Sequence, residues 1–156
     1  MHTITIFGKP VPTQRHGFDF TNKRAYTPPK TREAMRRRIA MIQKYMLMNR
    51  VKILKEVPLK VSLTFYHPRP KKWSTKLLRQ MAQEYGSQPI PKTTKADVDN
   101  LAKMMLDCAT QAGLWGDDCL ITDMVVFDRY VGLDETGNQL SPKTEMIVQT
   151  LTFGKK

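Results

Sequence analysis

Residues 97–118 read DVDNLAKMMLDCATQAGLWGDD, and most of what the sequence predicts starts from this stretch. Its apolar residues recur at intervals of three and four, which is the spacing of an amphipathic helix. We predict a helix over residues 99–112 that ends at Gly113, because glycine readily adopts the left-handed conformation that terminates a helix. The apolar face of this helix is formed by Leu101, Met104, Met105, Cys108 and Ala112.

Two aspartates stand at the start of this helix. Side chains two positions apart point ~200° away from each other inside a helix, but they point to the same side in an extended segment. Asp99 is a good N-cap residue, so we expect residues 96–98 to be extended and the helix to start at Asp99. The carboxylates of Asp97 and Asp99 would then point the same way. Lys103 and Asp107 follow on the side of the helix opposite its apolar face.

A second pair of acids, Asp117 and Asp118, follows the helix after a turn at residues 113–116. The chain reverses there, and the reversal can bring one of the pair back toward the helix start. Three carboxylates from two segments would form a Mg²⁺ site, completed by water and a substrate phosphate. Such a site hydrolyses phosphodiesters, and Lys103 would neutralise charge on the phosphate or on the leaving oxygen. A single D-x-D more often caps a helix, so a purely structural role is the alternative.

Charge is unevenly distributed along the chain. The 156 residues carry a net charge of +12, and residues 1–96 hold 21 Lys and Arg against four acids. Residues 97–129 instead hold seven Asp against two basic residues. Cationic surface attracts a phosphate backbone, and clustered carboxylates supply oxygen ligands for a divalent cation. This distribution favours nucleic acid as the partner over an anionic membrane surface.

Several other classes of protein are disfavoured. The sequence has no run of about 18 apolar residues and no basic-then-apolar N-terminal segment, so we expect a cytoplasmic protein without membrane contact. The two cysteines fit a reducing compartment, with buried thiols. No Gly-rich phosphate loop occurs, and no small-molecule cofactor is expected. A zinc site from Cys108, Cys119 and His67 has no ligand spacing in its favour.

The remaining segments complete a single domain over residues 1–156. We predict strands over 3–7 and 58–66, helices over 31–48 and 75–85 with Ser74 as a cap, and strands over 120–131 and 145–153 joined as a long hairpin by a turn at 134–138. Residues 8–29 and 86–96 are predicted loops. The order β-α-β-α-α-β-β indicates an α+β fold with a mixed or antiparallel sheet packed with helices.

Two basic regions are candidates for contacts with DNA phosphates. They comprise Arg15, Lys23, Arg24, Arg36, Arg37 and Arg38 near the N-terminus, and Arg69, Lys71 and Lys72 further on. A run of charges is often only a solvated face, but +17 over residues 1–96 exceeds what solubility requires. Phe18, Phe20 and Tyr26 lie within the first region. One of them either stacks at a DNA branch point or packs down onto the domain.

The acidic stretch resembles the signature of the RusA family of Holliday-junction resolvases. The likeness runs through residues 97–103, Asp107, residues 113–115 and residues 117–118. Residues 8–12, Arg15 and residues 25–28 also resemble the entry segment of family members, and the similarity spans roughly residues 4–130. The chain departs from the family pattern at Ala96, where a proline is common, and at Leu120, where a polar residue is common.

The resemblance implies a small homodimeric endonuclease that requires Mg²⁺, for which Mn²⁺ can substitute, and that cuts four-way DNA junctions symmetrically. Carried over by position, the catalytic residues are Asp97, Asp99, Asp118 and Lys103, and the three aspartates hold the metal. Asp117, Asp107 and Asn100 are expected to lie around them. Branched DNA is the expected partner.

Two alternatives stay open at this point. One is a nucleic-acid-binding accessory protein without catalytic activity, and the other is a metal nuclease for flaps or other branched DNA. The dimer contact is also undecided. It involves either an exposed strand edge or the apolar stripe of the first helix, formed by Met35, Ile39, Ile42 and Met46.

Overall fold

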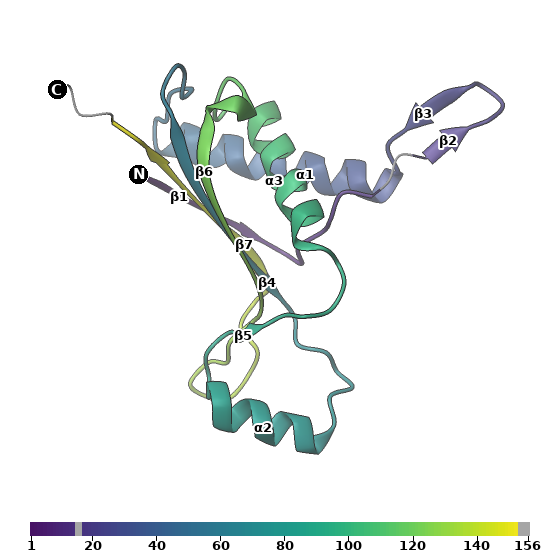
Figure 1. The fold of residues 1–156 in the computed structure, drawn as a ribbon, viewed down its shortest axis with the longest axis vertical. Helices are drawn as coiled ribbons and strands as arrows, with labels where there is room; N and C mark the ends of the chain where they lie inside the picture. Colours follow the sequence, from purple (N-terminus) through teal and green to yellow (C-terminus); the bar gives the residue numbers. More distant parts are fainter. Residues whose placement is uncertain (15–16, 153–156) are drawn as a thin grey trace.

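A mixed β-sheet forms the centre of the protein (Figure 1). The computed structural model describes residues 1–14 and 17–152. The order of the five-stranded sheet is β1 (His2–Phe7), β7 (Lys143–Thr150), β4 (Leu59–His67), β6 (Ile121–Tyr130) and β5 (Ile90–Pro91). Strands β4 and β6 are parallel, and the other neighbouring strands are antiparallel. The predicted α+β fold with a mixed sheet is confirmed.

Strand β4 lies between β7 and β6 because its alternate side chains form the middle of the core. These side chains are fully buried: Leu59, Val61, Leu63 and Phe65. The long hairpin predicted for the last two strands is therefore wrong, since β4 separates β6 from β7. The predicted turn does form, and Oδ1 of Asp134 accepts hydrogen bonds of 2.9 Å from the backbone N–H groups of Thr136 and Asn138.

Two helices, α1 (Pro29–Met48) and α3 (Val98–Ala112), pack on one face of the sheet. The apolar face of α3 is buried much as predicted, and Leu101, Met105 and Cys108 are inaccessible to solvent. The helix ends at Gly113, whose φ of 79° is left-handed, as predicted. The apolar stripe of α1 also faces the core, where Ile42 is fully buried. This stripe is therefore not available as a dimer contact.

Two smaller units lie at the periphery of the sheet (Figure 1). Helix α2 (Thr75–Tyr85) starts as predicted, and Oγ of Ser74 accepts the N–H of Leu77 at 3.2 Å. A hairpin of β2 (Gly17–Asp19) and β3 (Arg24–Tyr26) projects at the other side, in a segment predicted to be a loop. The turn of this hairpin forms because Oδ1 of Asp19 accepts the N–H groups of Thr21 and Asn22.

The second predicted loop also contains a strand, since β5 pairs with the end of β6. Among residues 1–14 and 17–152, none of the helices has the length and apolar character needed to cross a lipid bilayer.

Candidate active site

The start of α3 presents Asp97 without a capping role. The helix begins at Val98, and Asp97 is the N-cap residue, with extended backbone angles of −69° and 137°. The prediction that Asp99 is the N-cap is wrong, because Asp99 already lies in the first helical turn. The side chain of Asp97 caps no backbone N–H of the helix. Its carboxylate therefore has no local structural task, while the positive end of the helix dipole favours a negative charge there.

One solvent-facing side of α3 carries a row of charged side chains. Asp99, Lys103 and Asp107 follow each other at intervals of four residues, opposite the buried face, as predicted. Partial burial raises the pKa of the Asp107 carboxyl; the charge of Lys103 lowers it, and that of Asp118 raises it further. The charge of Asp118 therefore acts on Asp107, the last residue of this row.

Asp118 lies at the far end of α3. Its Oδ1 accepts a hydrogen bond of 3.0 Å from Nε1 of the buried Trp115, and it also bonds the hydroxyl of Thr110. Thr110 is eleven residues beyond Asp99, which is ~16 Å along a helix axis. The reversal after the helix therefore does not return Asp118 to the helix start. Its neighbour Asp117 accepts the N–H of Cys119 at 2.8 Å, and this bond lowers the pKa of the Asp117 carboxyl.

This separation decides how one chain can hold a metal. Oxygen ligands of a single Mg²⁺ ion lie ~2.1 Å from the ion, so they must lie within a few ångströms of one another. Within residues 1–14 and 17–152, no three Asp, Glu, His or Cys side chains are grouped closely enough to hold one ion. Asp97 and Asp99 lie at one end of α3, and Asp118 lies at the other. One chain alone does not assemble the three predicted ligands.

A cavity of about 450 Å³ opens beside the start of α3, and we call it the Asp97 groove. Its wall includes Lys92, Lys95, Asp97, Val126, Asp128 and Arg129. A second cavity, of about 340 Å³, shares Lys92 and Lys95 with it and adds Lys9, Arg69 and Lys71. Asp97 therefore faces a surface rich in cations, which is suited to a phosphate backbone. Lys9, Lys92 and Lys95 were not among the predicted site residues, although Lys92 and Lys95 lie only five and two residues before Asp97 in the sequence.

The floor of the Asp97 groove is fixed by a buried ionic cluster. Nζ of Lys92 lies 3.1 Å from Oδ2 of Asp128 and 2.6 Å from the carbonyl oxygen of Thr94. Nε2 of His67 lies 2.7 Å from Oδ1 of Asp128, close enough for an ion pair but not aligned for a hydrogen bond. The cluster ties β4 and β6 to the segment that leads into α3. It positions the groove, and Lys92 is not available to DNA because its side chain is buried.

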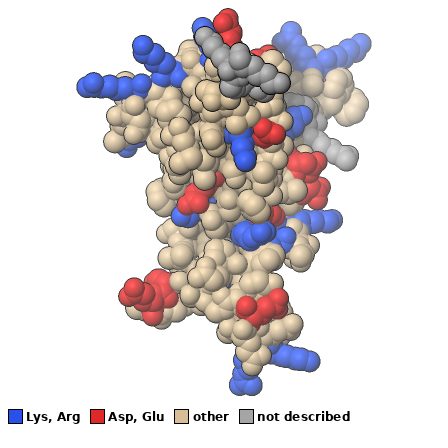
Figure 2. Space-filling view, turned by 60° about the vertical axis from the view of Figure 1, so that its left-hand side comes forward, with Lys and Arg blue, Asp and Glu red and all other residues tan. Residues whose placement is uncertain are grey.

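The predicted DNA-binding residues of the first region fall into three groups. Arg15 lies outside the described residues. Lys23 and Arg24 on the hairpin and Arg36 and Arg37 on α1 are exposed. Figure 2 shows Lys and Arg side chains projecting at both ends of the molecule.

Arg38 belongs to the third group and corrects the prediction. Its side chain is 8% exposed, and its guanidinium donates to the carbonyl oxygens of Ala34 at 3.0 Å and Lys9 at 3.2 Å. Burial lowers the pKa of the Arg38 guanidinium. Arg38 therefore holds the N-terminal segment against α1 and does not face DNA.

In the second region, Arg69 is also engaged within the chain. Its Nε donates to the carbonyl oxygen of Val131 at 2.8 Å, and burial lowers the pKa of its guanidinium. Lys71 and Lys72 are exposed. These two lysines are therefore the members of the predicted set that remain available to a phosphate here.

The aromatic residues of the β2–β3 hairpin are exposed. Phe18 and Tyr26 are each 50% accessible and Phe20 is 85% accessible, although Phe18 and Phe20 contact each other edge to face with ring centroids 5.0 Å apart. Between the two sequence-based alternatives, stacking on a partner and packing onto the domain, the structure rules out packing onto the domain for these rings. The hairpin therefore presents exposed aromatic rings beside Lys23 and Arg24.

A family model described as Endodeoxyribonuclease RusA matches residues 8–143, nearly the whole chain and all of the acidic stretch. No curated protein matches the chain at a significant level.

Proposed function

We propose, on the premise that the chain belongs to the RusA endodeoxyribonuclease family, that it is a Mg²⁺-dependent enzyme that resolves four-way DNA junctions by paired hydrolysis of phosphodiester bonds. Family membership identifies the chain as a DNA endonuclease. The metal, the junction and the residue roles are the proposal. The observation that carries it is the start of α3, where Asp97 performs no capping and opens onto a cation-rich groove.

The residues around this groove have different roles in the proposed reaction. Lys95 and Arg129 attract the DNA backbone and hold a phosphate beside Asp97. Asp97 and Asp99 would hold the metal, since Mg²⁺ commonly uses one or two carboxylates together with substrate phosphate oxygens. When bound, the ion supplies a water of lowered pKa and stabilises negative charge on the phosphate. Lys103, one turn along α3, neutralises charge on the phosphate or on the departing oxygen.

The β2–β3 hairpin supports a branched substrate over a linear duplex. Its aromatic rings and its basic residues Lys23 and Arg24 are exposed, which supports contacts of these two cations with phosphates. At a branch point the bases are less firmly stacked, so an aromatic side chain can insert at a smaller energetic cost. The same feature would serve a flap nuclease, and the substrate comparison below separates the two.

Cleavage of three labelled substrates tests the proposal: a four-way junction, a flap and a linear duplex of the same sequence. Each is incubated with Mg²⁺, Mn²⁺, Ca²⁺ or a chelator. We expect paired cuts in the junction with Mg²⁺ or Mn²⁺, and binding without cutting in Ca²⁺, whose coordination is longer and looser. Full activity in chelator would contradict the metal, and a preference for the flap would contradict junction resolution.

A further inference from the structure

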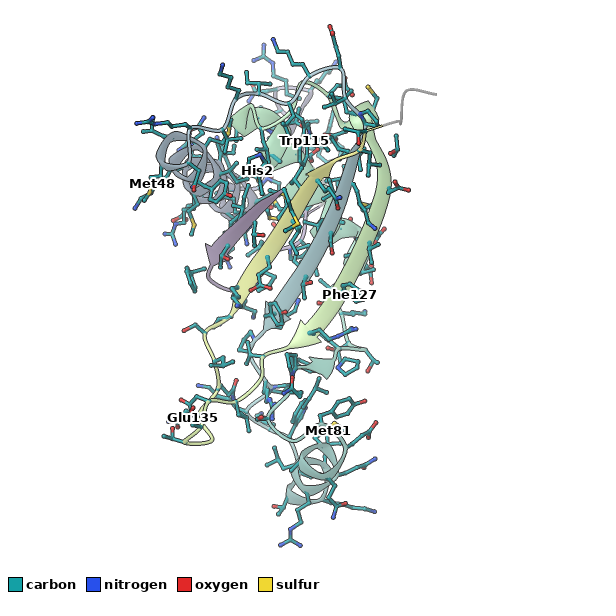
Figure 3. The ribbon with its side chains drawn as sticks, turned by 90° about the vertical axis from the view of Figure 1, so that its left-hand side faces the viewer. His2, Met48, Met81, Trp115, Phe127 and Glu135 are labelled. Carbon is teal, nitrogen blue, oxygen red and sulfur yellow. The ribbon has the colours of Figure 1, made fainter. Side chains whose placement is uncertain are left out.

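The ends of the two parallel strands, β4 and β6, border a cavity that has no part in the reaction described above. It has a volume of about 340 Å³, and it shares Lys92 and Lys95 with the neighbouring Asp97 groove. His67 and Tyr130, the last residues of β4 and β6, line it, and the arrows of both strands point toward α2 (Figure 3). Ligands of open sheets commonly bind outside the carboxyl ends of parallel strands. We call this space the His67 cavity.

The wall of the His67 cavity has an excess of positive charge. Among the residues that the structure describes, no Asp or Glu lines it. Cations of the wall come from four separate segments of the chain, and they are Lys9, Arg69, Lys71, Lys92 and Lys95. A concave surface lined by charges of one sign concentrates ions of the opposite sign. The His67 cavity is therefore suited to an anion.

The less exposed cations of this wall are only partly compensated by the chain itself. Asp128, which lines the Asp97 groove, has its Oδ2 3.1 Å from Nζ of Lys92 and its Oδ1 2.7 Å from Nε2 of His67. Arg69 has a neutral partner, because its Nε donates to the carbonyl oxygen of Val131 at 2.8 Å. One carboxylate thus serves two cations and an imidazole. Removing a positive charge from water is costly unless a negative charge accompanies it, so a bound anion would complete the balance.

His67 contributes a buried polar group without a hydrogen-bond partner. Its side chain is 8% exposed, and none of the described residues forms a hydrogen bond with its Nε2, since Asp128 is close but not aligned. The neighbouring polar groups of the wall are occupied, because the hydroxyls of Tyr130 and Thr94 bond each other at 2.8 Å. Buried polar groups are nearly always hydrogen-bonded in folded proteins. An unpartnered imidazole in a cationic cavity therefore points to a ligand that accepts hydrogen bonds.

We propose that the His67 cavity binds a phosphate group of the cleaved DNA strand, next to the phosphate held at Asp97. The inference rests on the proposed function. Because the two cavities share Lys92 and Lys95, a strand that lies in one leads into the other. Pro68 and Pro70 add an apolar part to the wall that suits a deoxyribose, which favours a strand over a free phosphate ion. Phosphate contacts fix the register of a protein on DNA, so this second contact positions the bond that is cut.

Junctions with a single uncharged phosphate test this contact. Each junction of the set carries one methylphosphonate at a different position of the cleaved strand, and binding is measured in Ca²⁺. Substitution at the scissile position and at one neighbouring position should each weaken binding about ten-fold, as for the loss of a charged hydrogen bond. A chain that cuts junctions but is sensitive only at the scissile position would overturn this inference alone. A chain that neither binds nor cuts them would contradict the proposed function instead.

Two variants connect the second sensitive position to the His67 cavity. Lys71→Gln and His67→Gln should each reduce the effect of the neighbouring methylphosphonate to less than about three-fold and leave the effect at the scissile position intact, because the two losses are coupled. Lys72→Gln is the matched control, since it removes the same charge one residue outside the wall, and both positions should stay sensitive. Circular dichroism checks that the variants fold, and the exposed Lys71 decides if His67→Gln does not. Identical patterns in Lys71→Gln and Lys72→Gln would overturn the inference.

Inorganic phosphate gives a readout that needs neither DNA nor cleavage. Titration at constant pH should shift the imidazole resonances of His67 in the NMR spectrum, which the His67→Gln variant identifies, and the shift should be much smaller in Lys71→Gln than in Lys72→Gln. An unchanged His67 signal would overturn the inference. Binding of the ion without a second sensitive position in the junction would also overturn it, because the ligand would then be free phosphate and not the DNA strand.

Discussion

The two ends of α3 hold their acids in opposite ways. At the start, Asp97 caps nothing and opens onto a groove lined by Lys95 and Arg129. At the end, Asp118 accepts hydrogen bonds from Trp115 and Thr110, one of which comes from a buried indole. The difference is that the backbone alone positions the first acid, whereas side chains that the fold requires position the second. Substitutions at the start of the helix should therefore affect function without affecting stability, whereas substitutions at its end should affect both.

The largest expected effect comes from removing charge at the start. Asp97→Asn and Asp99→Asn should each reduce single-turnover cleavage by about 10³-fold or more, because each removes a proposed ligand for the ion that would stabilise the reacting phosphate. Junction affinity in gel shifts should be unchanged or stronger, since a negative charge near the DNA is lost. The melting temperature should not move. Variants that cut at the wild-type rate would place the reaction elsewhere.

A substitution at the end of α3 should affect both cleavage and stability. Asp118→Ala removes the acceptor of the Trp115 indole N–H, and we expect a loss of about 1 kcal/mol in the free energy of unfolding in addition to loss of cleavage. Asp99→Ala is the matched control, and its free energy of unfolding should change much less. Urea titration monitored by Trp fluorescence measures both variants. Equal losses of unfolding free energy in Asp118→Ala and Asp99→Ala would contradict the proposed difference between the two ends of the helix.

A smaller effect should follow from one cation of the Asp97 groove. Lys95→Gln should weaken junction binding several-fold and reduce the slope of log K against log salt by about one, as expected for a single phosphate contact. Lys44→Gln on α1 is the control for loss of a positive charge away from the groove. An identical slope in the wild type and the Lys95 variant would mean that DNA does not enter the groove.

The smallest effect concerns the two thiols, which lie at the buried face and beyond the end of α3. Burial raises the pKa of the Cys108 thiol to about 11, so only about one part in 10³ is thiolate at pH 8. Cys119 is exposed, contrary to the expectation that both thiols are buried. A thiol reagent at pH 8 should therefore modify Cys119 within minutes and Cys108 only after unfolding. Two equally fast thiols would show that the core around α3 opens readily.

The features that the sequence predicted well depend on neighbouring residues. Gly113 ends α3 and Ser74 starts α2 because the required backbone angles and cap bonds involve residues within a few positions. The sheet order was not predictable in this way. The insertion of β4 between β6 and β7 depends on contacts between segments more than 50 residues apart, and adjacent strands in the sequence favour the simpler hairpin.

Arg38 and Asp118 differ in how far the sequence indicates their positions. Arg38 lies four residues before Ile42 and three after Met35, so its position on the apolar side of α1 was readable from helical spacing. Asp118 was different. Its position depends on where the buried Trp115 finds an acceptor, and no local pattern indicates that the indole would select this carboxylate. The placement of acids at both ends of α3 was predictable, but the distance between them was not.

Helix α2 should unfold locally while the rest of the molecule stays folded. None of its eleven residues is fully buried, and isolated helices of this length are marginal in water, so its order depends on the Ser74 cap and a partial cover of apolar side chains. Its backbone amides should exchange with deuterated solvent well before those of α3, whose amides are protected by the core. The end of the molecule that carries Lys76 and Arg79 would thus unfold and reform many times during the lifetime of the folded sheet, as a cooperative unit of its own.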